Sequence, residues 1–218
     1  MASAQMATRI VRVSSDPPTT PSQLRDLAVS TLDQAARTFA DEPIDVLGYA
    51  STSTAYALGF EAEATVVSRL SAVAGVPVAS TCASAVRALR LLEVERIALV
   101  EPPWFAAGLV ELGEAYFRSQ GFDVVSSQRA ELSQDPGRIE PADVVEWTSR
   151  HVREEAQGIF IGGNGFRAAG AIDTLEHVTE RLVITSNQVL LWNLLEAANA
   201  TLEITGYGRL FAQRPAAL

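Results

Sequence analysis

The chain has 218 residues, of which 48% are hydrophobic, and its formal net charge at pH 7 is −9. This hydrophobic content is ample for a buried core, and the length fits one large domain or two small ones. The acidic charge argues against a nucleic-acid or anionic-membrane surface, but it leaves room for a local site that binds an acidic small molecule. Apolar runs are interrupted before the roughly 18 residues that a membrane span needs, and residues 1–9 lack the apolar core of a signal peptide, so we expect a cytoplasmic protein.

The few residues that commonly bind metals are scattered along the chain. Cys82 is the single cysteine, which excludes an intrachain disulfide and a metal cluster built on cysteines. His151 and His177 lie in charged, helix-like sequence, and we expect both on helix surfaces. The sequence therefore predicts neither a metal site nor a cofactor.

The first part of the chain alternates between strand-like and helix-like patterns. It predicts an edge strand, an amphipathic helix, a strand that ends in hydroxyl residues, a helix, a strand that ends in small polar residues, and a helix. These expected elements cover residues 8–13, 24–39, 44–49, about 60–74, 75–82 and 83–92.

The pattern then restarts near Glu93. Strands are expected at residues 96–100, 122–127, 158–161 and 182–185, and helices at 105–120, 141–155, about 172–181 and up to about 199. We expect Ser186 and Asn187 to cap the last helix.

This alternation predicts an α/β fold of parallel sheets flanked by helices. The two runs of it predict two pseudo-symmetric halves with a cleft between their strand ends. One half comprises residues 1–92 plus 186–218, and the other comprises residues 93–185.

Two loops at expected strand ends are rich in small residues. Residues 51–54 follow the strand at 44–49, and residues 162–165 follow the strand at 158–161. Ligands of open α/β sheets bind at the carboxyl ends of strands, and small residues bring backbone N–H groups close to a ligand. A capped turn without a ligand is the alternative for the first loop, and a tight turn is the alternative for the second.

Four segments in the correct order resemble the aspartate/glutamate racemase superfamily, in particular maleate cis–trans isomerase and arylmalonate decarboxylase. These segments are residues 45–50 with their hydroxyl-rich continuation, 158–167, 185–192 and 206–211. The resemblance runs from about residue 8 to residue 211. It implies two α/β halves that bind a small carboxylate or dicarboxylate between them.

The resemblance also implies departures from the family pattern. Family members carry a cysteine on the first loop, the second, or both, and these positions align with Ser51 and Gly163 here. A tyrosine of the family aligns near Pro103 and is replaced. The resemblance also implies that the family's first strand is missing. Either a partner or unusual packing covers the gap, or the sheet carries an exposed edge, which makes a homo-oligomer plausible.

A carboxylate cradle survives these departures. Thr52 and Ser53 match the Thr-Ser pair of the family, and Asn164 and Gly165 are expected to donate from the other half. Trp104 is expected either to wall an apolar pocket or to pack in the core.

Cys82 and Glu101 are the candidates for the missing acid or base. Cys82 lies where a helix N-terminus would lower the pKa of its thiol. The alternative interpretation is a small buried residue that packs behind the site. Glu101 ends a strand, and its alternative is a solvated loop carboxylate.

The leading functional hypothesis is a cofactor-independent isomerase or decarboxylase that acts at the carbon next to a small carboxylate. The alternative is a non-catalytic protein of the same fold that binds a carboxylate or a partner. Hydrolysis through Ser51 ranks last, because no base or orienting acid is evident in the sequence.

Overall fold

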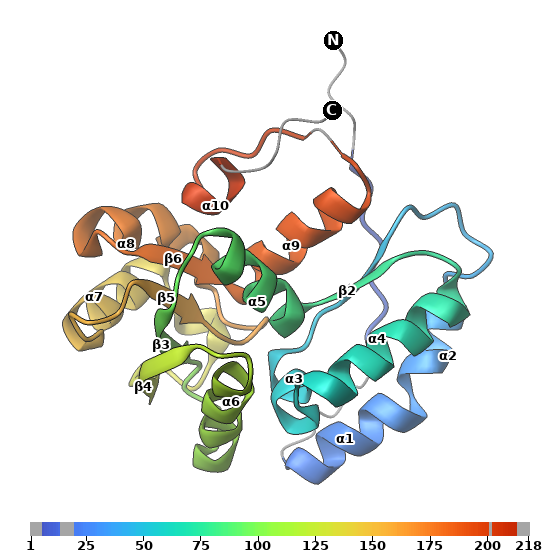
Figure 1. The fold of residues 1–218 in the computed structure, drawn as a ribbon, viewed down its shortest axis with the longest axis horizontal. Helices are drawn as coiled ribbons and strands as arrows, with labels where there is room; N and C mark the ends of the chain where they lie inside the picture. Colours follow the sequence, from blue (N-terminus) through green and yellow to red (C-terminus); the bar gives the residue numbers. More distant parts are fainter. Residues whose placement is uncertain (1–5, 14–19, 201, 213–218) are drawn as a thin grey trace.

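The computed structural model describes residues 6–13, 20–200 and 202–212. Two parallel sheets form its framework, one of four strands in the order β4-β3-β5-β6 and one of two strands, β1-β2 (Figure 1). The strands are β1 Leu47–Tyr49, β2 Val78–Ser80, β3 Arg96–Glu101, β4 Asp123–Arg129, β5 Gly158–Ile161 and β6 Leu182–Thr185. The predicted α/β fold of parallel sheets flanked by helices is therefore confirmed.

Helices connect the strands and surround both sheets. The α-helices are α1 Pro21–Ser30, α2 Leu32–Arg37, α3 Thr52–Leu58, α4 Phe60–Ala74, α5 Thr81–Leu91, α6 Ala107–Ser119, α7 Pro141–His151, α8 Ile172–Thr179, α9 Ser186–Ala197 and α10 Arg209–Ala212. Two short 3₁₀ turns, η1 Pro136–Arg138 and η2 Ala169–Ala171, lie before α7 and α8.

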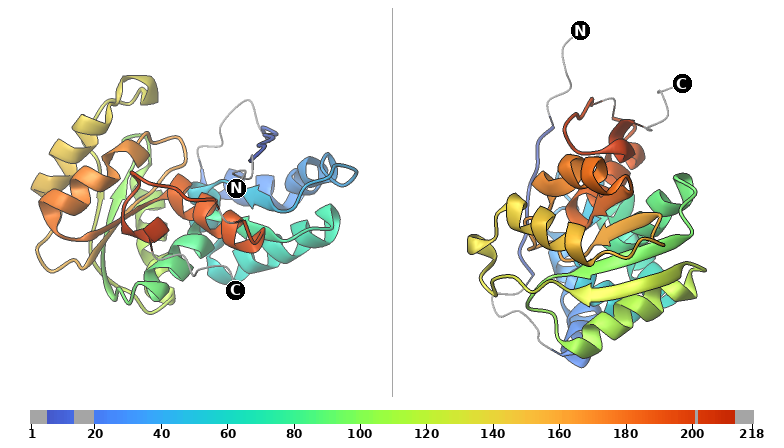
Figure 2. Two further views of the ribbon diagram at one scale, coloured as in Figure 1. Left: turned by 90° about the horizontal axis from the view of Figure 1, so that it is seen from above. Right: turned by 90° about the vertical axis from the view of Figure 1, so that its left-hand side faces the viewer.

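Both faces of the four-stranded sheet are buried under helices (Figure 2). Alternate strand residues point to opposite faces, so Phe160 joins the core with α5, α6 and α9, whereas Ile159 and Ile161 join the core with α7 and α8. This two-sided cover explains why β3, β5 and β6 are almost continuously apolar, whereas the edge strand β4 carries polar residues.

The two-stranded sheet packs between α9 and a layer formed by α2 and α4 (Figure 1). Tyr49 lies in a third core cluster with apolar residues of α1, α2 and α4. On the other side, Gly48 allows α9 to approach, because a Cβ there would lie 2.9 Å from Leu194 Cδ1. Helix α9 also contacts β6, so it touches strands of both sheets.

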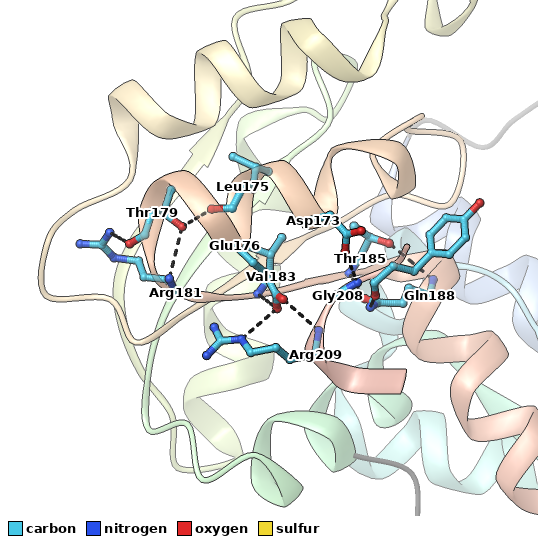
Figure 3. Close-up of polar contacts among 11 residues, drawn as sticks. Asp173, Leu175, Glu176, Thr179, Arg181, Val183, Thr185, Gln188, Gly208 and Arg209 are labelled. Atoms are coloured by element: carbon cyan, nitrogen blue, oxygen red, sulfur yellow. Dashed lines mark hydrogen bonds and ion pairs between the residues drawn. The ribbon is translucent and has the colours of Figure 1, made fainter. Parts of the chain in front are cut away.

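The C-terminal segment is fastened to α8 and α9 by its backbone (Figure 3). Asp173 Oδ1 accepts from the N–H of Gly208 at 2.5 Å, and Glu176 Oε2 accepts from the N–H of Arg209 at 2.9 Å. Gln188 Nε2 donates to the carbonyl of Tyr207 at 2.6 Å. These contacts place Leu210 and Phe211 in the core beside α5 and α9.

Most predicted elements are present, and three predictions are wrong. Residues 8–13 form no strand, because they pair with no other strand; Ile10 is 84% exposed. The helix expected over 24–39 is divided at Thr31, whose φ of −117° is outside the helical range. The cap of α9 is Thr185 rather than Ser186 and Asn187.

Helix α3 was not predicted, since its residues were interpreted as a hydroxyl-rich loop. The expectation that His151 and His177 lie on helix surfaces is confirmed. The division of the chain into residues 1–92 plus 186–218 and 93–185 stays a prediction. Within the described ranges, no helix is long and apolar enough to cross a membrane.

Candidate active site

The carboxyl ends of four strands meet at one polar cluster. Thr52 follows β1, Thr81 follows β2, Asn164 follows β5, and Ser186 follows β6. Thr52 Oγ1 lies 2.9 Å from Ser186 Oγ and accepts a hydrogen bond from the Gly163 N–H at 3.1 Å. Because these residues come from both sheets, the cluster joins the two sheets at their carboxyl edges, where the sequence predicted the site.

Asn164 lies at the centre of this cluster. Its Oδ1 accepts from the N–H and the hydroxyl of Thr52, both at 3.1 Å, and lies 3.4 Å from Thr81 Oγ1. Its Nδ2 donates to Asn187 Oδ1 at 3.0 Å, and the side chain of Asn187 donates back to the Asn164 carbonyl. The atom of Asn164 that faces Thr52 is its acceptor oxygen, while its Nδ2 also donates to Thr81 Oγ1 at 3.2 Å, so the expected donor role toward a ligand stays a prediction.

Ser51 and Ser53 are half-buried and lie at the start of α3. Ser51 Oγ accepts from the Thr54 N–H at 3.2 Å and lies 3.4 Å from Ser53 Oγ. Ser51 therefore has the ordinary role of a helix N-cap. Its described hydrogen-bond partners include no side chain that would act as a base.

The glycine loop after β5 is shaped by close contacts. Gly163 has φ +82°, and a Cβ there would lie 2.6 Å from Pro102 Cγ, so both the backbone and the space favour glycine. Gly165 is exposed above Trp104, which is half-buried and packs edge-on against Phe166 at a centroid distance of 5.9 Å. Trp104 thus supports the loop from one side.

Glu101 is a buried acid directly beside this loop. Its side chain is 0% exposed, Oε1 accepts from the hydroxyl of Tyr56 at 2.7 Å, and Oε2 has no hydrogen-bond partner among the described residues. Burial raises the pKa of Glu101 to about 8, against the opposing effect of the Tyr56 hydrogen bond. Glu101 therefore carries its proton at neutral pH, and the interpretation as a solvated loop carboxylate is wrong.

Helix α3 connects the acid to the cluster. Thr52 and Tyr56 are four residues apart, so they lie on the same face of the helix. Gly162 makes room for the carboxyl, since a Cβ there would lie 2.2 Å from Glu101 Oε2. The next residue, Gly163, donates to Thr52. A protonated acid thus lies one residue along the loop from the hydroxyl cluster.

A family model for arylmalonate decarboxylase matches residues 22–211 of this chain. The chain belongs to the arylmalonate decarboxylase family. The superfamily resemblance inferred from the four sequence segments is thereby confirmed.

Solved structures of this superfamily share the fold at low sequence identity. An arylmalonate decarboxylase structure has a TM-score of 0.80 and 20% identity, over 87% of this chain and 84% of that one. The maleate isomerase Iso from Pseudomonas putida S16 has a TM-score of 0.81 and 22% identity, over 89% and 80%. A mutant of the Nocardia farcinica maleate cis–trans isomerase with a covalently bound succinylcysteine intermediate has a TM-score of 0.81 and 20% identity, over 90% and 82%. Comparison with curated protein sequences gives no significant match.

In this member of the family, the one cysteine lies behind the cluster. Cys82 is fully buried on α5, and its Sγ lies 3.9 Å from the carbonyl oxygen of Thr52. The expected lowering of its pKa is wrong, because burial, followed by the charges of Glu63 and Glu101, raises the pKa of this thiol. Cys82 therefore stays a thiol at neutral pH.

Sequence reasoning missed four residues of the site: Tyr56, Thr81, Ser186 and Asn187. Thr81 and the Ser186–Asn187 pair directly follow strands, so the same rule that selected Thr52 would have found them. Tyr56 carried no such signal, because it was placed after the loop in a segment without a predicted element.

A surface hollow of about 520 Å³ lies elsewhere, at the amino ends of β3 and β4, and is lined by Arg96, Asp123, Val125, Arg153 and Glu155. It is open and shares no residue with the cluster, so we place the candidate site at the carboxyl edges. In the part of the chain that the structure describes, no three His, Cys, Asp or Glu side chains gather to hold a metal.

Proposed function

We propose that this protein is a cofactor-independent enzyme of isomerase or decarboxylase type that moves a proton at the carbon next to a small carboxylate. The observation that carries the proposal is Glu101, a buried acid that keeps its proton at neutral pH beside the glycine loop. Membership in the arylmalonate decarboxylase family supports the reaction class.

The hydroxyl cluster is the proposed carboxylate cradle. Thr52, Ser53 and Ser186 offer hydroxyl groups, and Gly165 brings a backbone N–H to the same edge, where the N–H of Gly163 holds Thr52 in place. Hydrogen bonds from neutral donors to a carboxylate are stronger than those between neutral groups, so a few such donors suffice to orient a small acid. Trp104 closes one side of the loop and would limit the size of the substituent.

Glu101 is the proposed proton donor. In a decarboxylation, the bond between the α-carbon and one carboxyl group breaks, carbon dioxide leaves, and the electron pair delocalises into the remaining carboxylate as an enediolate. Glu101 would give its proton to the α-carbon, and the resulting carboxylate would regain a proton from water. A donor whose pKa lies near the working pH suits this step, since it is protonated at rest yet gives up its proton readily.

Proton exchange in D₂O tests this function. The protein is incubated with maleate, phenylmalonate and a panel of 2-substituted carboxylic acids, and NMR follows deuterium at the α-position, loss of carbon dioxide and cis–trans conversion. Glu101→Gln keeps the shape of the buried side chain but supplies no acid, so we expect turnover to fall at least about 100-fold while binding shifts remain. Full turnover in this variant would exclude Glu101 as the donor.

The cradle has its own test. Thr52→Val removes the hydroxyl at the centre of the cluster and keeps the size of the side chain, so we expect it to abolish carboxylate binding. Unchanged affinity would overturn the cradle. Ser51→Ala is the matched control, because Ser51 caps α3 through Thr54, so its loss should affect helix stability more than binding.

A non-catalytic carboxylate-binding protein is the second candidate. It is favoured by the two family cysteine positions, which here hold the capping residue Ser51 and Gly163, and by the burial of Cys82. Binding shifts without any exchange in the native protein would support this candidate over the enzyme. Assembly into a homo-oligomer and a cytoplasmic location also remain proposals, which gel filtration with light scattering and cell fractionation would test.

A further inference from the structure

The side chain of Asn164 occupies the centre of the proposed cradle. A backbone N–H can only donate, so the N–H of Thr52 fixes the amide orientation with Oδ1 toward it. The hydroxyl of Thr52 donates to the same oxygen at 3.1 Å, and Thr81 Oγ1 lies 3.4 Å away. Both donors of Thr52 thus converge on one acceptor oxygen, whereas Thr81 Oγ1 is nearer to Asn164 Nδ2 and accepts from it at 3.2 Å.

This set of contacts is the one that a carboxylate oxygen would make. An amide oxygen and a carboxylate oxygen have similar size and trigonal geometry, but the carboxylate carries negative charge and accepts more strongly. The hydrogen-bond partners of the Asn164 side chain are the uncharged residues Thr52, Thr81 and Asn187, so no ion pair has to be broken when a carboxylate replaces the amide.

We infer that Asn164 is an internal occupant of the carboxylate site: its amide oxygen takes the place of a substrate carboxylate oxygen and must rotate away when a substrate binds. The inference deepens the proposed function and rests on it for the identity of the ligand. Asn164 would then determine which ligands bind. A weak hydrogen-bond acceptor cannot displace an amide oxygen that already satisfies the donors, whereas a carboxylate can.

The surroundings allow the side chain to leave while the backbone stays. Asn164 is half-buried, and its partner Asn187 is exposed, so rotation of the side chain leads toward solvent. The preceding residue is held by two contacts, the Gly163 N–H to Thr52 and the packing of Gly163 on Pro102. The carbonyl of Asn164 is held by the side chain of Asn187.

Asn164→Asp tests the preference of the site without any added ligand. It puts a carboxylate on the same donors, so we expect the new carboxyl to titrate well below the usual range near 4, by NMR. The variant should also melt at a higher temperature than Asn187→Asp at pH 7. Asn187→Asp is the matched control, because it adds the same charge at a residue that contacts Asn164 rather than the donors of Thr52. An ordinary or raised pKa for the new carboxyl would overturn the inference.

Asn164→Ala tests the competition directly. Removal of the Asn164 side chain frees the donors, so the dissociation constants of maleate and phenylmalonate should fall. We expect a fall of about tenfold if the ligand no longer has to displace one hydrogen bond. A rise in these dissociation constants would mean that Asn164 contacts the ligand as a donor, and would overturn the inference. If no variant exchanges deuterium but the Asn164→Asp titration behaves as expected, the proposed enzyme fails while the internal occupant stands.

Discussion

Gly162 is the residue that makes space for the buried acid. A Cβ at this position would lie 2.2 Å from Glu101 Oε2, which forces either the carboxyl or the loop to move. We therefore expect Gly162→Ala to lower the free energy of unfolding by about 1–3 kcal/mol, in the range of overpacked cores, and to lower turnover as well. Urea denaturation and the NMR exchange assay measure the two effects.

The matched control lies in the same loop. A Cβ at Gly165 would lie 3.6 Å from Trp104 Cζ2, which is ordinary van der Waals contact. Gly165→Ala should therefore fold with nearly unchanged stability. Equal stability of the two variants would contradict the close approach of Glu101 to Gly162.

Some of these residues were predictable from sequence and some were not. Thr52 and Asn164 were found because both follow strands, and the carboxyl ends of parallel strands meet at one edge. The protonation of Glu101 was not predictable, since it depends on burial against Tyr56 of α3 and Gly162 after β5, which are distant from it in the sequence. The acceptor role of Asn164 depends on one side-chain rotation, which no spacing pattern encodes.

At the scale of elements, α6 packs closely on α3 through Gly113. A Cβ there would lie 2.5 Å from the ring of Tyr56, whose hydroxyl holds Glu101. Alanine normally stabilises a helix relative to glycine by up to about 1 kcal/mol, but the clash should exceed this gain, so we expect Gly113→Ala to destabilise the protein by about 1–3 kcal/mol. It should also shift the pH profile of turnover, since the Tyr56–Glu101 hydrogen bond is displaced.

Gly108 provides the control on the same helix. It is exposed, and a Cβ there would meet nothing within 4 Å, so Gly108→Ala should be neutral or slightly stabilising. Thermal unfolding of both variants separates helix propensity from packing. If Gly113→Ala were as stable as Gly108→Ala, the close packing of α3 against α6 would be wrong.

The elements that sequence predicted best are those with a strong local pattern. The apolar strands β3, β5 and β6 were placed within about a residue, because strands buried on both faces read as apolar runs. Helix α3 was missed, since Ser51, Thr52 and Ser53 favour caps and turns in isolation. Residues 8–13 alternate like a strand but find no partner strand, and pairing is a property of the tertiary structure.

At the scale of the whole molecule, two tyrosine–glutamate pairs join the segments before and after residue 93. Tyr56 of α3 donates to Glu101 of β3, and Tyr116 of α6 donates to Glu63 of α4. Both carboxyl groups are buried, and burial raises the pKa of each. The packing of the two segments therefore depends on acids that prefer to stay neutral.

This dependence predicts an unusual response of stability to pH. Folding raises the pKa of Glu101 from 4.5 to about 8, so the folded protein binds this proton more tightly than the unfolded chain does. Its contribution to stability is therefore complete below pH 4.5 and is lost as pH rises toward 8, the reverse of a salt-bridged carboxylate. Between pH 5.5 and 8.5 we expect Glu101 to account for a loss of about 3 kcal/mol in urea denaturation. Glu101→Gln, which cannot ionise, should remove most of this loss; the same pH dependence in the variant and in the native protein would show that Glu101 is not the group responsible.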